Sequence, residues 1–113
     1  MDQRIFTRGD IVFVDNSIVK VGSEQGGGRP AVVVSNNRFN RTSGVIEIIF
    51  LTSHVKKPMQ THIIVHSGNR YSTALCEQIV SIDKSRVISI CGRCTLREMT
   101  SIDEALHYSL GLL

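Results

Sequence analysis

The chain has 113 residues, of which 42% are hydrophobic and 20% are charged. This balance is ordinary for a globular protein and excludes a disordered chain, and the length fits one domain. Lysine and arginine total 13 against 10 aspartates and glutamates, so the net charge is +3 and the isoelectric point is about 9.0. A mild basic excess permits a nucleic-acid partner without requiring one.

The cysteines and the length of the apolar runs indicate the compartment. The three cysteines, Cys76, Cys91 and Cys94, are an odd number, and no secretory segment is evident. Both observations argue against a disulfide framework. No apolar run approaches the ~18–20 residues that a membrane span needs. We therefore expect a protein of the reducing cytoplasm without a membrane partner.

Short apolar runs rich in β-branched residues dominate the chain, and clusters of Gly, Asn, Asp or Ser separate them. Such runs are typical of β-strands. The six runs are Ile11–Val14, Ala31–Val34, Val45–Leu51, His62–Val65, Ala74–Ile79 and Val87–Cys91. Six short strands with these breaks predict a mainly β fold, either a curled sheet or a small barrel.

The C-terminal segment has helical periodicity instead. Thr95 followed three residues later by Glu98 fits a capping box, and Ser101 offers a second possible start. Four apolar residues are spaced three or four apart, which places them on one helical face; they are Met99, Ile102, Leu106 and Leu110. Gly111 can end the helix. We expect one C-terminal helix lying on a mainly antiparallel sheet.

A long loop, Asn16 to Arg29, carries three consecutive glycines just before Arg29 and Pro30. Glycines let a backbone approach a ligand closely, and proline fixes the entry to the next strand. Arg29 is therefore held where a loop meets a strand, and its guanidinium can grip a phosphate with two hydrogen bonds. A solvated arginine is the alternative. The segment is not a nucleotide P-loop, because Gly28-Arg29 stands where Gly-Lys-Ser/Thr is required and a strand follows.

Hydroxyl groups follow the third predicted strand. Thr52 comes directly after Val45–Leu51, with Ser53 beside it. Hydroxyls at a strand end can donate hydrogen bonds to a phosphate oxygen. The alternative is a β-branched residue that simply closes a strand.

The fifth predicted strand contains a charged residue. Alternation predicts Cys76 and Gln78 on one face, and Leu75 and Glu77 on the other. A charge inside an apolar strand needs a partner or exposure. Glu77 is therefore either an active-site or base-reading carboxylate or an ordinary edge-strand residue.

No motif for metal or covalent catalysis stands out. Cys91 and Cys94 match C-x-x-C, but no second ligand pair has matching spacing, so the role of buried small hydrophobic residues is favoured. The four histidines form no ligand motif, and no G-x-S-x-G motif is present. We predict no metal site and no cofactor.

Several short motifs follow one another along the chain from Arg8 to Leu110, and their order and spacing form a recognisable pattern. The most specific is Gly22-Ser23-Glu24-Gln25 followed closely by Arg29-Pro30. The others are Arg8–Asp15, Gly28–Asn36, Asn40, Leu51–Ser53, Pro58, Thr61–His62, Glu77–Gln78, Ile82–Arg86, Ile102–Leu106 and Ser109–Leu110. Together they resemble the MazF/PemK family of toxin ribonucleases. Residues 1–113 are accordingly expected to form a single domain of this family.

The resemblance implies a small curled antiparallel β-barrel like that of Src-homology-three domains, of the PemK/CcdB type, with a C-terminal helix. It also implies a symmetric homodimer that cleaves single-stranded RNA at a short sequence without a metal ion, and that a cognate antitoxin inhibits. The family's catalytic arginine and threonine match Arg29 and Thr52. Some PemK-type members carry a further arginine where this chain has Leu75, so the chain resembles the branch that works with the Arg/Thr pair.

Other residues are expected to contact the RNA. The chain has four Phe, two Tyr and no Trp, so reading of unstacked bases by hydrogen bonds is favoured over stacking. The expected RNA-binding residues are Glu24, Gln25, Asn36, Ser53, Glu77 and Gln78.

Metal-free RNA cleavage uses the 2′-hydroxyl of the substrate as nucleophile and leaves a 2′,3′-cyclic phosphate and a 5′-hydroxyl end. Arg29 suits stabilisation of the developing phosphorane charge, an effect worth about 3–4 kcal/mol, and Thr52 can donate to the same phosphate. Arginine is a poor base near neutral pH. The proton acceptor therefore stays open among Glu24, Glu77 and His62.

Two other functions fit the same architecture. A non-enzymatic, CcdB-like gyrase poison shares the fold, but that group uses a C-terminal tail containing Trp, and this chain has no Trp. A peptide-binding barrel without catalysis usually exposes an aromatic-lined groove. Six aromatic residues in 113 give that function weak support.

Overall fold

A computed structural model describes residues 2–15, 27–54, 57–67 and 70–112. Its elements are β1 (Asp10–Asp15), β2 (Gly28–Val33), α1 (Asn37–Thr42), β3 (Val45–Thr52), β4 (His62–Ser67), β5 (Arg70–Asp83), the 3₁₀ turn η2 (Lys84–Arg86), β6 (Val87–Arg93) and α2 (Leu96–Leu110). No helix of the described ranges is both long and apolar enough to cross a membrane.

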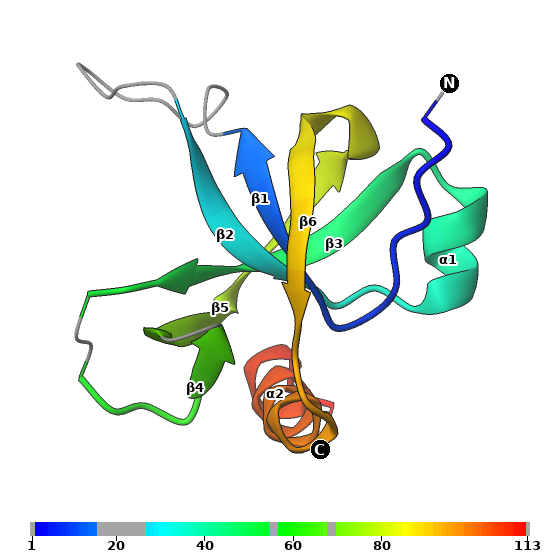
Figure 1. Cartoon of the computed structure of the whole chain (residues 1–113). Coiled ribbons are helices and arrows are strands. Elements are labelled where there is room, and N and C mark those ends of the chain that lie inside the picture. The colour runs from blue at the N-terminus through cyan, green and yellow to red at the C-terminus, as the bar shows by residue number, and fades with distance from the viewer. Residues whose placement is uncertain (1, 16–26, 55–56, 68–69, 113) are drawn as a thin grey trace, which may run out of the picture.

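The six strands form one antiparallel sheet in the order β4-β5-β3-β2-β1-β6. The sheet curls on itself, and α2 packs against β4 and β5 (Figure 1). Because β4 and β6 remain its two edges, the sheet is a half-open barrel. The predicted curled antiparallel sheet with a C-terminal helix is confirmed.

Alternate residues of the central strands supply two hydrophobic cores. Val32 of β2 packs in the core that α2 covers, whereas Ala31 and Val33 pack in the core on the other face. Ile49 and Ile48 of β3 divide in the same way, and both are fully buried. Burying such a side chain contributes about 1.5–3 kcal/mol. The middle of the sheet is thus held from both faces.

The strand β5 extends well beyond its predicted range and contains a register shift. Ile49 lies opposite Ile79, but Leu51 lies opposite Ala74. An advance of two residues along β3 therefore corresponds to five residues along β5. The extra residues of β5 must leave the regular pleat.

The predicted alternation in β5 is wrong for this reason. Cys76 is fully buried, but Gln78, which should share its face, is exposed together with Glu77. Extra residues in one strand break the period of two on which the prediction relied.

Helix α2 begins at the first of its two possible starts. The Thr95 hydroxyl accepts a hydrogen bond from the Glu98 N–H, and the Glu98 carboxylate accepts one from the Thr95 N–H, which completes the capping box. Gly111 ends the helix with a φ of 71°. The predicted apolar face lies in the core except for Leu110, the last helical residue, which is exposed.

Sequence analysis does not predict the short helix α1. Asn36 caps it by accepting a hydrogen bond from the Phe39 N–H at 2.8 Å. The buried Asn40 is hydrogen-bonded to the side chain and the backbone of Ser35. A helix of six residues is too short for an apolar period to show.

The cysteines differ in exposure. Cys76 and Cys94 are buried, and burial raises the pKa of both thiols to about 12, so they stay protonated. Cys91 is exposed. The expectation that Cys91 is a buried hydrophobic residue is therefore wrong, because it lies on the edge strand β6, most of which is exposed.

We expect Gly28→Ala to lower the free energy of unfolding by about 1–3 kcal/mol, as overpacking does. A Cβ at Gly28 would lie 2.5 Å from the Val14 carbonyl oxygen and 2.8 Å from Cε2 of Phe13. The backbone oxygen cannot move without disturbing the pairing of β1 with β2. Urea denaturation measures the change. Gly44→Ala, where nothing lies within 4 Å of the new Cβ, should cost less than about 0.5 kcal/mol. Equal losses in the two variants would contradict the prediction.

Candidate active site

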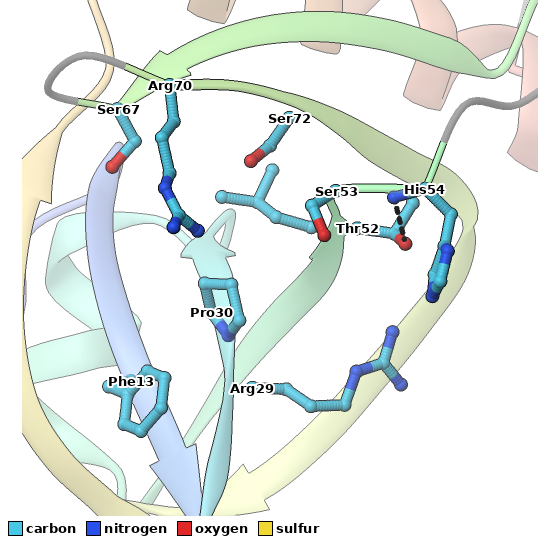
Figure 2. Close-up of a pocket in the computed structure, with 10 residues that line it drawn as sticks. Phe13, Arg29, Pro30, Thr52, Ser53, His54, Ser67, Arg70 and Ser72 are labelled. Atoms are coloured by element: carbon cyan, nitrogen blue, oxygen red, sulfur yellow. Dashed lines mark hydrogen bonds between the residues drawn. The ribbon is translucent and has the colours of Figure 1, made fainter.

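A cavity of about 510 Å³ opens where the ends of β2 and β3 meet the β4–β5 hairpin. Figure 2 shows the side chains that line it. They are Phe13, Arg29, Pro30, Leu51, Thr52, Ser53, His54, Ser67, Arg70 and Ser72. The cavity therefore gathers residues that lie far apart in the sequence.

The pairing of β2 with β3 brings Arg29 and Thr52 to one place. Ala31 lies opposite Phe50 in this antiparallel pair. Continuing the register by two residues in each strand brings Arg29 opposite Thr52, and alternation puts both on the face of Phe50. The two residues that sequence analysis singled out as catalytic thus line the same cavity.

Arg29 rests on an aromatic ring. Its Cζ atom lies 4.1 Å from the ring centroid of Phe50, whose own exposed fraction is 6%. A guanidinium over an aromatic face is held by a cation–π interaction. Partial burial lowers the pKa of Arg29 from its usual value, but an arginine stays charged near neutral pH. The cavity therefore contains a fixed positive charge.

Thr52 has a free donor. The backbone N–H of His54 donates to its Oγ1 at 3.2 Å, the hydrogen bond drawn in Figure 2. Because the hydroxyl oxygen accepts there, its own hydrogen remains available to a group in the cavity. Ser53 lines the cavity beside it, and the His54 imidazole projects from the same segment.

No carboxylate is among the described residues that line this cavity. Two guanidinium groups and four hydroxyl groups face it instead. Such a lining suits an anion with several oxygen acceptors, and a phosphodiester is an anion of that kind.

Glu77 and His62 form a separate cluster. Nε2 of His62 lies 3.1 Å from the Glu77 carboxylate, and its Nδ1 lies 2.9 Å from the Lys57 carbonyl oxygen. Neither residue lines the cavity of Arg29. Burial acts to raise the pKa of Glu77, but hydrogen bonds from its own backbone and from His62 outweigh burial and lower it.

The other predicted RNA-binding residues do not lie together. Ser53 lines the cavity. Asn36 lies in a different hollow, near Arg8, where its side chain caps α1. Gln78 is exposed in the irregular part of β5. Glu24 and Gln25 lie outside the described residues.

Sequence analysis missed several lining residues, above all His54 and Arg70. The sequence held a weak signal for His54, because residues two positions apart, such as Thr52 and His54, are expected on the same side of a strand. None existed for Arg70, because only the return of the β4–β5 hairpin brings it to the cavity. Within the described ranges no three His, Cys, Asp or Glu side chains are grouped as metal ligands.

The PemK-like, MazF-like toxin family of type II toxin–antitoxin systems matches residues 7–110. The chain belongs to this family. It is 39% identical to the endoribonuclease EndoA of Bacillus subtilis over 114 residues, which cover 96% of this chain and 97% of that protein. It is 33% identical to the endoribonuclease MazF of Staphylococcus saprophyticus over 110 residues, covering 93% and 91% of the two chains.

Solved structures of the family have the same fold. A mycobacterial endoribonuclease in complex with its cognate antitoxin matches with a TM-score of 0.79 at 23% identity, over 95% of this chain and 96% of that one. MazF from Deinococcus radiodurans matches with a TM-score of 0.78 at 24% identity, over 96% and 99%. The resemblance to the MazF/PemK family drawn from the sequence motifs is confirmed.

We expect Glu77→Gln to remove a part of the stability that depends on pH. Because its pKa is lower in the folded chain, the Glu77 carboxylate stabilises the fold above its unfolded pKa, and this contribution is lost as the pH falls through the folded pKa. The side chain is 37% exposed, so the effect is at most about 1 kcal/mol.

Urea denaturation at pH 7 and at pH 3 tests this expectation. The variant should be less stable than the wild type at pH 7, and the difference should shrink at pH 3. Glu104→Gln, on the exposed side of α2, serves as the matched control. A difference that stays constant between the two pH values would contradict the expectation.

Proposed function

We propose that the chain, acting as one toxin domain over residues 1–113, is an endoribonuclease that cleaves single-stranded RNA at a specific short sequence. One observation carries the proposal: Arg29 and Thr52, from neighbouring strands, line one cavity that has no carboxylate among its described residues. Two relatives that share more than 30% of their residues with this chain are named endoribonucleases, which supports the same activity.

The proposed reaction needs no metal ion. The 2′-oxygen of the RNA attacks the adjacent phosphorus, the new O2′–P bond forms, and the P–O5′ bond breaks. The products are a 2′,3′-cyclic phosphate and a 5′-hydroxyl end. Arg29 stabilises the negative charge that develops on the phosphorane, and the Thr52 hydroxyl donates to the same group. Both groups stand in place before the reaction, so little reorganisation is required.

The 2′-hydroxyl proton needs an acceptor and the leaving 5′-oxygen needs a proton. Of the three acceptors expected from the sequence, Glu77 and His62 bind one another outside the cavity, and Glu24 lies outside the described residues. His54 does line the cavity, and imidazole is the side chain best suited to proton exchange near neutral pH. We assign both proton transfers to His54: its neutral imidazole accepts the 2′-hydroxyl proton, and the imidazolium then donates that proton to the leaving 5′-oxygen.

The partners follow from the family. A mycobacterial relative has been solved in complex with its cognate antitoxin, and we propose that an antitoxin likewise neutralises this chain. We also propose that the chain acts as a homodimer in the cytoplasm, and that Ser53 binds RNA beside the reacting phosphate. Glu24, Gln25, Asn36, Glu77 and Gln78 remain proposed RNA contacts.

The deciding experiment incubates the purified protein with a long RNA in EDTA, followed by mapping of the cut sites and end groups. We expect cuts at one short sequence, with 5′-hydroxyl ends. RNA that stays whole in EDTA and with added Mg²⁺ would overturn the proposal and favour a toxin that acts on gyrase. Cleavage only with Mg²⁺ would overturn the metal-free reaction.

We expect Arg29→Ala to lower kcat by about 10²–10³-fold, the usual cost of removing one charge-stabilising group. The fold should persist, because Arg29 lies in the half-buried first part of β2 and the fully buried residues of the strand follow it. Single-turnover cleavage of a short RNA containing the mapped site measures the effect. Arg97→Ala, exposed on α2, is the control. A folded Arg29→Ala protein that cleaves RNA at the wild-type rate would contradict the role of Arg29 in stabilising the phosphorane.

We expect His54→Gln to lower kcat by about 10²-fold or more, as loss of a general acid or base does, with RNA affinity nearly unchanged. Single-turnover cleavage of the same RNA measures the loss. His107→Gln, exposed on α2, should behave as the wild type. A folded His54→Gln variant that keeps the wild-type kcat would exclude His54 from the proton transfers.

A further inference from the structure

The cavity holds a second guanidinium group, that of Arg70, which the reaction just described does not use. Arg70 is the first residue of β5 and pairs with Ser67, the last residue of β4. In Figure 2 its side chain extends from the β4–β5 hairpin toward Pro30, on the opposite side of the cavity from Arg29. The two arginines thus flank one cavity from different strands.

Four of the nine arginines of the chain are paired with aspartates. Ion pairs join Arg4 to Asp2, Arg8 to Asp103, Arg86 to Asp15 and Arg93 to Asp10. In the part of the chain that the structure describes, neither Arg29 nor Arg70 has an ion pair, and no carboxylate lines the cavity between them. Among the described residues, no carboxylate balances the positive charge of this cavity.

The ligand chemistry follows from the lining. A guanidinium offers several N–H donors in a planar fork that fits phosphate oxygens. Ser67 and Ser72 stand on the Arg70 side of the cavity, and Ser53 lies between Ser72 and Thr52. Single-stranded RNA carries one phosphate for each nucleotide, so a strand lying across the cavity presents two anionic groups in succession.

We propose that Arg70 binds the phosphate next to the scissile one, and so positions the RNA strand across Arg29 and Thr52. This inference rests on the proposed ribonuclease function. Arg70 is a positioning residue in this scheme, because it contacts a phosphate that undergoes no bond change. Its loss should weaken RNA binding and leave the chemical step intact.

The test measures binding and cleavage separately. A fluorescent RNA containing the mapped cut site, with a 2′-O-methyl group on the nucleotide that would attack, binds but cannot react. Each phosphate contact contributes about 0.7 to the slope of log affinity against log salt for a single strand. We expect Arg70→Ala to reduce this slope by about 0.7 and to weaken binding about five-fold at 0.1 M salt.

Cleavage of the unmodified RNA should show the same weakening of binding without a change in the chemical step. KM should rise about five-fold at 0.1 M salt while kcat stays within about two-fold of the wild type. Arg70→Lys should restore the slope but only part of the affinity, because an ammonium lacks the planar fork. Arg38→Ala, exposed on α1 and outside the cavity lining, should leave both the slope and KM unchanged.

The outcomes separate the inference from the function on which it rests. Wild-type affinity and slope in Arg70→Ala would overturn the phosphate contact while leaving the ribonuclease proposal in place. A fall in kcat with unchanged affinity would also overturn it, since Arg70 would then act in the chemical step. If the wild type binds RNA without cutting it, the ribonuclease proposal fails, and the salt slope still decides the contact. A wild type that binds no RNA would overturn both.

Discussion

The antiparallel register between β2 and β3 is the constraint on which the site depends. With Ala31 opposite Phe50, the two strands deliver Arg29 and Thr52 to the same end and the same face of the sheet. Neither catalytic candidate needs to hold the other in place. Their positions are set further along the strands, where isoleucines such as Ile48 and Ile49 are buried in cores on both faces. A slip of one residue would exchange the two cores and separate the pair.

The same arrangement explains the charge of the cavity. Strand ends and a hairpin supply hydroxyl groups and two guanidinium groups, while aspartates elsewhere neutralise four other arginines. Two of the chain's positive charges thus lie in one hollow without a carboxylate among its described lining residues. Fixed charge is effective against a phosphorane because it is in place before the negative charge develops. The local distribution of charge matters more here than the total.

The irregular part of β5 has the opposite effect, because it separates groups that the sequence appeared to offer to one site. The extra residues of β5 expose Glu77 and Gln78 together, and Glu77 binds His62 instead of facing Arg29. The Glu77 carboxylate is therefore held by the His62 side chain outside the cavity. The residue proposed for the proton transfers is then His54, which lines the cavity and which no family motif singles out.

Local pattern alone predicted the six strands and the helix with its capping box at Thr95, and the motifs shared with the family singled out Arg29 and Thr52 as the catalytic candidates. Each of these depends on residues that are neighbours in the chain, so period and spacing reveal them. Only the tertiary structure shows that Glu77 lies outside the cavity and that His54 and Arg70 line it. Those outcomes depend on a register shift between distant strands and on the return of a hairpin, and no period within a single segment carries that information.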